Sequence, residues 1–369
     1  MIKKLRIITG LILFAFVAMH LVNIAMGLSS VALMERAQPW LLGIWSNVVV
    51  APILMVAFLV HMGLGLQAVY RRNTLQIKRN DIVQIVSSLI LVPLLIPHLV
   101  GTYVVREFFG LPQDYPGILM LFWYYEPAEG LRQVVLLAAT WIHGCIGLFI
   151  WLRLQPWWSK VSLFLSPLAV ALPVFAMLGY VEGGKAVMSG AVEVVYAQPP
   201  EGGMSLDEIL VRLDQIKYWL IGLFLLIVVL VLVARWWRLM GHDGATRVHY
   251  VGQPAYTAEN GLTLLESATV NDIPHAALCG GRGRCGTCRV RVVKTSEELA
   301  SASDEELHTL ARIGAAGDVR LACQLKVAGG HLEVERLLPP YLKHSELSRT
   351  HGGAEALRGR KDGALEAAE

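Results

Sequence analysis

A chain of 369 residues is long enough for two domains. Hydrophobic residues make up 55% of it and charged residues only 17%, with a mean hydropathy of +0.52, which excludes an ordinary soluble protein and indicates a membrane protein. The formal net charge of +3, without a basic tract, gives no indication of nucleic-acid binding.

The apolar excess lies in the first two thirds of the chain, in stretches long enough to cross about 30 Å of hydrocarbon. The stretches are residues 5–28, 45–70, 82–104, 131–152, 161–181 and 216–233. Lys3 and Lys4 before the first stretch are compatible with a signal peptide, but its length favours a retained helix. We therefore predict that residues 1–238 form an α-helical membrane bundle with six transmembrane helices.

Basic residues gather in one set of connections between these spans and acidic residues in the other. The basic set is Lys3, Lys4, Arg6, Arg71, Arg72, Lys78, Arg79, Arg153, Lys160, Arg235 and Arg238. The acidic set is Glu35, Asp114, Glu126, Glu129, Glu182, Glu193, Glu201, Asp207 and Glu208. The positive-inside rule then predicts cytoplasmic termini in a bacterial inner membrane. Residues 118–125 are too short to span and are expected at the interface, and Ser205 to Glu208 form a capping box before the sixth span.

Each of the first four spans carries one histidine, and the last two carry none. They are His20, His61, His98 and His143. Ionisable groups in a bilayer are functional candidates, although a single histidine can also be an interhelical hydrogen-bonding group. Counted from the cytoplasmic helix ends, His20 and His98 are roughly 21 and 25 Å deep, whereas His61 and His143 are each roughly 15 Å deep.

Two histidines at matched depth on different helices can supply both axial ligands of a b-type haem. We therefore predict one haem between His20 and His98 and a second between His61 and His143. The HxxxH patterns of a di-iron site are absent from the sequence. Glycines on these helices could make room for haem, or could equally serve helix packing. They are Gly27, Gly63, Gly65, Gly101 and Gly144.

One ligand on each of four helices resembles the di-haem b membrane anchors of succinate:quinone and fumarate:quinone reductases. In that resemblance the first and third ligands share one haem, and the second and fourth share the other. The depth argument arrives at the same pairing independently.

After a linker at 239–246, the pattern changes to short strands and turns. Strand-like segments are expected at 247–252, 288–293, 319–327 and 332–337, and a short helix at 262–268. Ser303 to Glu306 form a capping box that opens a helix through Arg312. This order fits a small α+β domain of the β-grasp type at 247–338. The remainder, 339–369, is rich in Gly, Ala, Glu and Arg and is expected to be disordered.

Four of the five cysteines lie in one constellation: Cys279, Cys285, Cys288 and Cys323. Three on a tight loop and one from a distant strand can give two thiolates to each iron of a [2Fe–2S] cluster. The glycines of the loop allow positive φ, which turns backbone N–H groups toward the sulfides. They are Gly280, Gly281, Gly283 and Gly286. Such a centre implies a reducing compartment.

Other sites made from these cysteines fit less well. Only Cys285 and Cys288 form the Cys-x2-Cys pair that is typical of zinc sites, although zinc remains open. Disulfides need an oxidising compartment, and a Rieske centre needs histidines in the loop. The first gap of five residues resembles the adrenodoxin-like ferredoxins and the ferredoxin domain of the sodium-translocating NADH:quinone reductase. Arg282, Arg284, Arg289 and Arg291 surround the loop, where they could raise the cluster potential, meet an acidic partner or face anionic lipid headgroups. The plain alternative is a solvated basic face.

Together, the histidine-bearing helices and the cysteine motif resemble the N-terminal redox module of bacterial membrane-anchored class III adenylate cyclases. That resemblance implies a quinone-responsive di-haem domain joined to a ferredoxin domain. The residues after Pro340 are too few for a cyclase domain, so cyclic nucleotide synthesis is not expected of this chain.

We predict electron transfer between the quinone pool and a cytoplasmic partner protein. The alternatives are a redox-sensing regulatory module and a cofactor-carrying subunit of a respiratory complex. Asn23, Tyr70, Tyr103 and Trp141 are the candidate quinone contacts, and no catalytic residue is assigned. The sequence has no Rossmann fingerprint for a nicotinamide cofactor, so a partner dehydrogenase would have to supply hydride chemistry.

Overall fold

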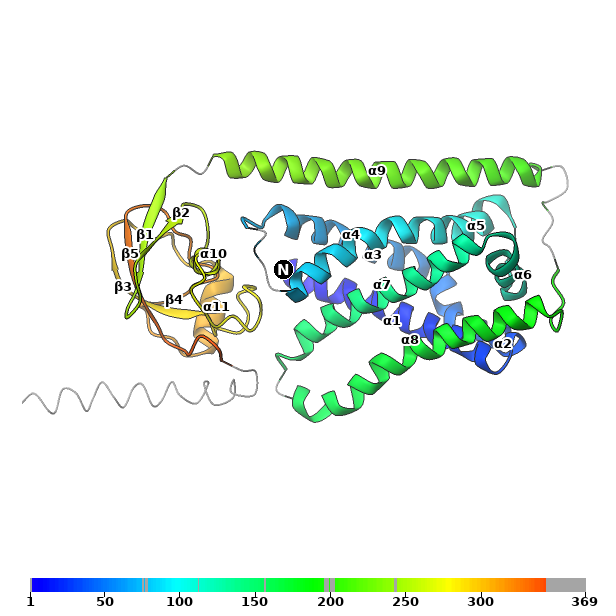
Figure 1. The fold of residues 1–369 in the computed structure, drawn as a ribbon, viewed down its shortest axis with the longest axis horizontal. Coiled ribbons are helices and arrows are strands. Elements are labelled where there is room, and N and C mark those ends of the chain that lie inside the picture. The colour runs from blue at the N-terminus through cyan, green and yellow to red at the C-terminus, as the bar shows by residue number, and fades with distance from the viewer. Residues whose placement is uncertain are drawn as a thin grey trace, which may run out of the picture. The chain divides into compact units, whose positions relative to one another are not determined.

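The computed structural model describes residues 2–342 except 75, 77, 78, 112, 156, 196–198, 200–202, 242 and 243. The chain divides into two compact units, each drawn in Figure 1. The first unit comprises Met1–Tyr70, Ile82–Phe149 and Ser159–Val233. The second comprises Arg71–Asp81, Ile150–Trp158 and Ala234–Glu369, so it combines two connections between spans with the C-terminal domain.

Among the described residues, six helices are long and apolar enough to cross a membrane, which confirms the six-span prediction. They cover Lys4–Leu28, Val50–Tyr70, Arg79–Phe109, Pro127–Leu152, Lys160–Met188 and Leu206–Met240. The helices concerned are α1 (Ile2–Ala25), α3 (Val50–Tyr70), α4 (Arg79–Leu99) with α5 (Val105–Phe109), α7 (Pro127–Leu152), α8 (Trp158–Met188) and α9 (Leu206–Met240). Helices are expected here because a spanning segment must satisfy its own backbone hydrogen bonds.

Shorter helices begin at capped positions between the spans. Helix α2 (Val31–Leu42) starts after Ser30, whose hydroxyl accepts a hydrogen bond from the Leu33 N–H at 3.0 Å. Helix α6 (Tyr115–Met120) starts after Asp114, whose carboxylate accepts from the Gly117 N–H at 2.8 Å. It continues as a π-helical turn, Leu121–Tyr125. The second span begins at Val50 and not at residue 45, because Gly43–Ser46 form a separate 3-10 turn.

The helix that carries His20 is fixed by a small core in the first unit. Leu21 of α1, Trp141 of α7 and Ala176 of α8 are buried together. The rings of Phe14 and Trp141 stack with centroids 5.1 Å apart, and the Trp141 indole N–H donates to the Ala169 carbonyl at 2.6 Å. These contacts hold α1 against α7 and α8.

The C-terminal domain is a mixed five-stranded sheet with strand order β2-β1-β5-β3-β4 (Figure 1). The strands are β1 (Ala245–Tyr250), β2 (Tyr256–Glu259), β3 (Arg289–Thr295), β4 (Val319–Leu321) and β5 (His331–Arg336). Strands β1 and β5 pair in parallel, and the other pairs are antiparallel. Helices α10 (Leu264–Val270) and α11 (Asp304–Arg312) contribute to the core beneath the sheet. The predicted small α+β domain is confirmed.

Several predicted boundaries need correction. Strand β2 was not predicted, and β4 ends at Leu321 because the chain turns there, with Gln324 N–H donating to the Leu321 carbonyl. The predicted linker 239–246 is partly regular, since α9 extends to Met240 and β1 begins at Ala245. Apart from residues 339–342, the tail expected to be disordered lies outside the described residues.

Candidate functional site

The four constellation cysteines converge at one end of the sheet. Cys279, Cys285 and Cys288 lie on the loop between α10 and β3, and Cys323 follows β4. All four are free and buried, with at most 6% of each residue exposed. The loop glycines Gly280, Gly281, Gly283 and Gly286 all have φ between 63° and 78°, which confirms the positive φ expected from the sequence.

The sulfur atoms are arranged as two pairs. Cys279 interacts with Cys285, and Cys288 with Cys323. The hydrogen bond from Cys285, together with backbone N–H groups of residues 282, 284 and 285, lowers the pKa of Cys279 well below its usual range despite burial. The neighbouring sulfur, that of Cys279 for Cys285 and of Cys323 for Cys288, raises the pKa values of Cys285 and Cys288, and burial raises them further. One thiolate in the loop is thus favoured before any metal binds.

This donor set fits two irons better than one zinc ion. A structural zinc site would need four ligands around one point, whereas a [2Fe–2S] cluster needs two thiolates at each iron. Cys279 with Cys285 and Cys288 with Cys323 are the residues that would hold the two irons.

Neighbouring side chains fix the loop. The Thr309 hydroxyl of α11 donates to the Gly283 carbonyl at 2.6 Å, and the Thr287 hydroxyl lies 3.0 Å from Cys285 Sγ. Arg291 is ion-paired with Asp318 and Glu335, at 2.9 and 2.5 Å. The arginines around the loop are therefore not one uniform solvated basic face.

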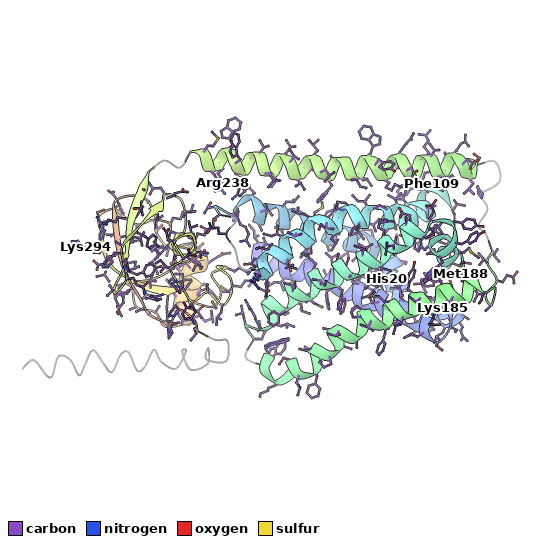
Figure 2. All side chains as sticks on the ribbon, in the orientation of Figure 1. His20, Phe109, Lys185, Met188, Arg238 and Lys294 are labelled. Carbon is purple, nitrogen blue, oxygen red and sulfur yellow. The ribbon has the colours of Figure 1, made fainter. Side chains whose placement is uncertain are left out.

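The four span histidines form two close pairs in the first unit. The ring centroids of His20 and His98 are 6.1 Å apart, and those of His61 and His143 are 6.3 Å apart. His20 lies among the helices (Figure 2). The structure therefore brings together the same partners that matched depth selected.

These separations suit a shared metal ion. An imidazole nitrogen binds a metal at about 2.0 Å and lies roughly 1.1 Å from the ring centre, so two axial imidazoles on one iron have centres about 6.2 Å apart. The rings of the two pairs are inclined at 64° and 88°. The residues that could hold a shared metal ion are therefore His20 with His98 and His61 with His143.

Polar side chains in the spans orient three of the four rings. The Nδ1 atoms of His61, His98 and His143 lie 3.1 Å from Thr9 Oγ1, 3.0 Å from Gln133 Oε1 and 3.2 Å from Ser87 Oγ, respectively. A ligating histidine usually donates its second N–H in this way, which leaves Nε2 for the metal. His20 Nδ1 is buried with no such partner among the described residues. Gln84 Nε2 lies 3.3 Å from His143 Nε2, so this amide must turn aside before a metal can reach that nitrogen.

The orienting residues Thr9, Ser87 and Gln133 were missed by the sequence argument. The available signal was their polarity inside apolar spans, but sequence alone does not say which helix face meets which histidine.

The span glycines divide between packing and open space. A Cβ at Gly27 would lie 2.5 Å from the Gly179 carbonyl oxygen, and one at Gly144 would lie 2.9 Å from Phe14. These two glycines therefore serve helix packing. A Cβ at Gly63, Gly65 or Gly101 would meet no described heavy atom within 4 Å, so close helix packing does not require glycine at these three positions.

The candidate quinone contacts are mostly engaged in the helix packing. Trp141 belongs to the core described above. Asn23 is fully buried and donates to the Met34 carbonyl at 3.2 Å and the Tyr115 hydroxyl at 2.9 Å. Tyr103 is 38% exposed. Asn23 and Trp141 thus have different hydrogen-bond partners within the helix packing.

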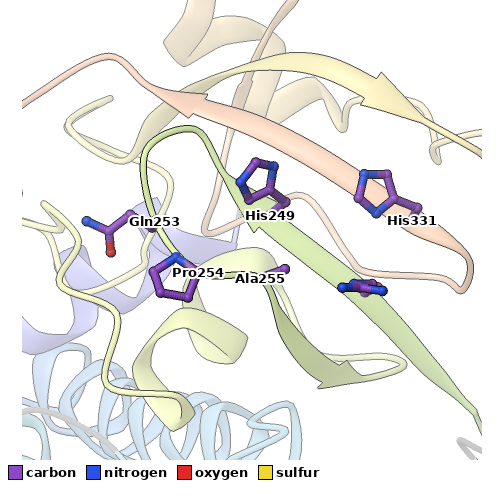
Figure 3. Close-up of a pocket in the computed structure, with 6 residues that line it drawn as sticks. His249, Gln253, Pro254, Ala255 and His331 are labelled. Carbon is purple, nitrogen blue, oxygen red and sulfur yellow. The ribbon is translucent and has the colours of Figure 1, made fainter.

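A surface pocket on the sheet lies apart from the sulfur site (Figure 3). It is lined by Arg247, His249, Gln253, Pro254, Ala255 and His331. His249 Nδ1 lies 3.2 Å from Glu333 Oε1. None of the four cysteines lines this pocket.

Comparison with known proteins locates the similarity in the C-terminal domain. The 2Fe-2S iron-sulfur cluster binding domain family matches residues 249–328. The chain is 37% identical over 68 residues to 2Fe-2S ferredoxin-5 of Aquifex aeolicus, covering 18% of this chain and 71% of that protein. It is 38% identical over 71 residues to a subunit of the Na(+)-translocating NADH-quinone reductase of Chlamydia pneumoniae, covering 19% of this chain and 16% of that protein.

The corresponding reductase subunit of Chlamydia muridarum is 29% identical over 115 residues, covering 31% of this chain and 26% of that protein. The chain thus spans only about a sixth to a quarter of these two relatives. The crystal structure of an ISC-like [2Fe-2S] ferredoxin from Pseudomonas putida matches with 31% identity and a TM-score of 0.23, covering 26% of this chain and 95% of that one.

Proposed function

This chain belongs to the [2Fe–2S] ferredoxin family through residues 249–328, and on that premise we propose that it is a membrane protein that passes electrons between the quinone pool and a cytoplasmic partner protein. A ferredoxin domain transfers electrons, and here it follows helices that can span a membrane. The proposal adds two b haems held by the histidine pairs. The observation that carries it is the pair of ring separations, 6.1 and 6.3 Å, close to the value that a shared axial iron requires.

The C-terminal domain would hold the cluster in a dry, preorganised site. Cys279 with Cys285 would bind one iron, and Cys288 with Cys323 the other. Backbone N–H groups of the loop already point at the Cys279 sulfur and lower its pKa, which favours the thiolate. Burial of all four cysteines excludes water from the sulfurs.

In the first unit, His20 and His98 would bind one haem iron, and His61 and His143 the other. Haem bound there would supply one-electron carriers at two depths of the membrane. Thr9, Ser87 and Gln133 would hold the Nδ1 protons, so that the Nε2 lone pairs face the metal. A quinol releases two electrons and two protons on oxidation to the quinone, so a chain of one-electron carriers must accept the electrons singly.

The two Chlamydia relatives are named as NADH-quinone reductase subunits, which supports a redox partner connected to quinone. The charge asymmetry of the connections supports a cytoplasmic ferredoxin domain in a bacterial inner membrane. A reducing compartment would also suit thiolate ligation of the cluster.

The haem proposal is tested by cofactor counts and single substitutions. A pyridine haemochrome assay with iron and sulfide determination should give two b haems and two non-haem irons per chain. His61→Ala and His143→Ala should each remove the same haem, and His20→Ala and His98→Ala the other. A different pairing, or a purified protein without a Soret band despite adequate haem supply, would contradict it.

Stopped-flow mixing with a quinol separates electron transfer from sensing. Haem reduction followed by delivery of electrons to an acceptor supports the transfer function. Haem reduction without onward flux would instead favour the regulatory module that the adenylate cyclase resemblance implies.

A further inference from the structure

Two connections between spans belong to the same compact unit as the ferredoxin sheet. Residues 71–81 run from the end of α3 into the first turn of α4, and residues 150–158 run from the last turn of α7 to the start of α8. Asn73 Nδ2 donates to the Gly261 carbonyl at 3.2 Å and to Glu266 Oε2 at 3.1 Å. Arg238, at the end of α9, donates to Asn73 Oδ1 at 2.9 Å. The 71–81 segment is therefore joined to the ferredoxin domain by side-chain hydrogen bonds.

The same segment reaches the cluster loop through an ion pair. Arg282 Nη2 donates to Asp81 Oδ1 at 2.6 Å, and Arg282 Nη1 donates to the Cys279 carbonyl at 2.8 Å. The Asp81 side chain is only 8% exposed and that of Arg282 24%. From the 150–158 segment, Arg153 donates to the Leu278 carbonyl, directly before Cys279. The residue that would bind the first iron is thus flanked by two anchors.

The Asp81 carboxylate lies against the loop itself. A Cβ placed on Gly280 would come within 3.2 Å of Asp81 Oδ2. Charges in such a position are weakly screened because little water reaches them. A carboxylate there disfavours the addition of an electron to a cluster in this loop, and the Arg282 guanidinium favours it, since cluster potentials depend on local charge and hydrogen bonding.

We propose that Asp81, in the first turn of α4, and Arg282 form an ion pair that fixes the cluster loop on residues 71–81 and sets the cluster potential, and we call this pair the latch. Asp81 and Arg282 are positioning residues, and neither ligates the cluster. The inference rests on the proposed cluster but not on the haems. The latch implies that the cluster keeps a fixed position relative to residues 71–81.

Redox titration of the purified full-length protein tests the latch. The cluster is reduced with dithionite and followed by its electron paramagnetic resonance signal in wild type, Asp81→Asn, Arg282→Gln and the double variant. Asp81→Asn should favour reduction by about tenfold, which for a one-electron couple is about 59 mV. Arg282→Gln should disfavour it by a similar factor, and the double variant should lie near wild type because the two charges are removed together.

Asp318→Asn is the matched control. Asp318 also pairs with a loop-side arginine, Arg291, but its side chain is 45% exposed and Arg291 keeps Glu335. In the Asp318→Asn variant the equilibrium constant for cluster reduction should stay within twofold of the wild-type value, because water and salt screen the Asp318–Arg291 pair. An equal shift in this control would overturn the assignment to Asp81.

Shifts of the cluster potential in the same direction for Asp81→Asn and Arg282→Gln would also overturn the proposal. Loosening of the loop would shift the potential in the same direction in both variants, whereas removal of a negative and of a positive charge should shift it in opposite directions. If Asp81→Asn loses the cluster, Asp81→Glu keeps the charge and should retain both cluster and potential; loss there too would contradict the electrostatic part. A wild-type protein without two non-haem irons would instead contradict the proposed cluster itself.

Discussion

The hydrogen-bonding groups at the Nδ1 atoms differ between the two histidine pairs. In the His61/His143 pair both rings have a hydroxyl at Nδ1, whereas in the His20/His98 pair only His98 has a partner, the Gln133 amide oxygen. An acceptor at Nδ1 makes the imidazole a stronger donor to a metal and stabilises the oxidised iron. We therefore expect the His61/His143 site to hold its haem at the lower potential of the two, other influences being equal.

Ser87→Ala tests this at one residue. Loss of the Nδ1 acceptor of His143 should weaken haem retention at that site by about 10- to 100-fold, and any haem retained should have a raised midpoint potential. Spectroelectrochemical titration of the purified protein resolves the two haems, and only one should change.

The neighbouring Ser88 is the matched control. Its hydroxyl donates to the Ile85 carbonyl at 2.7 Å, one turn earlier in the same helix. Ser88→Ala should leave both haems as in wild type. Equal effects from the two serine variants would show that helix packing, and not the histidine contact, is responsible.

At the scale of structural elements, the cluster loop requires glycine at position 286 for two separate reasons. Gly286 combines φ of 69° with close packing, because a Cβ there would lie 2.8 Å from Ile313 Cδ1. Gly314 has φ of 60° but a Cβ there would meet no described atom within 4 Å. A comparison of the two positions therefore distinguishes the cost of the left-handed backbone, which both share, from the cost of a steric clash, which only Gly286 has.

Gly286→Ala should destabilise the ferredoxin domain more than Gly314→Ala does. A left-handed alanine costs about 1–2 kcal/mol in either position, and overpacking at Gly286 adds about 1–3 kcal/mol. Thermal loss of the visible cluster absorption measures both variants in the full-length chain. Equal losses would mean that Ile313 moves aside at little cost.

Elements that depend on a simple period or on apolar length could be predicted, and those that depend on tertiary contacts could not. The six spans follow from hydropathy, since a helix in lipid needs no partner to satisfy its backbone. Strand β2 has four residues and exists through its pairing with β1, which no local pattern reveals. The helix at Ser303 begins as expected, with its hydroxyl accepting from the Glu306 N–H, but the buried Glu306 carboxylate binds Arg320 at 2.9 and 3.0 Å. That contact joins residues 14 apart and has no local sequence signal.

In the candidate site, too, some features could be predicted from the sequence and others depend on tertiary contacts. Helical rise alone selected the histidine pairs, because depth depends only on residue count. Which side chain meets each Nδ1 depends on the rotation of one helix against another. A difference of one residue turns a side chain by about 100° around a helix, so the orienting groups needed coordinates.

At the scale of the whole molecule, the basic connections and the ferredoxin domain share one compact unit. Residues 71–81 and 150–158, which carry Arg71, Arg72, Arg79 and Arg153, belong to it together with the sheet. A unit of this kind must lie on one side of the membrane. The positive-inside rule then predicts the cytoplasmic side for the connections and the domain alike.

Reporter proteins fused at two positions of the chain test this orientation. Alkaline phosphatase fused after Val195, between the fifth and sixth spans, should be active, because that connection is expected outside. Fused after Gly241, beyond the sixth span, it should be inactive, and a fluorescent protein at the two positions should give the reverse pattern. The reason is that Arg235 and Arg238 lie near the end of the sixth span, and basic residues close to a span end remain on the cytoplasmic side. Active phosphatase after Gly241 would place the thiolate site in an oxidising compartment, where its cysteines would be expected to form disulfides and not to bind iron.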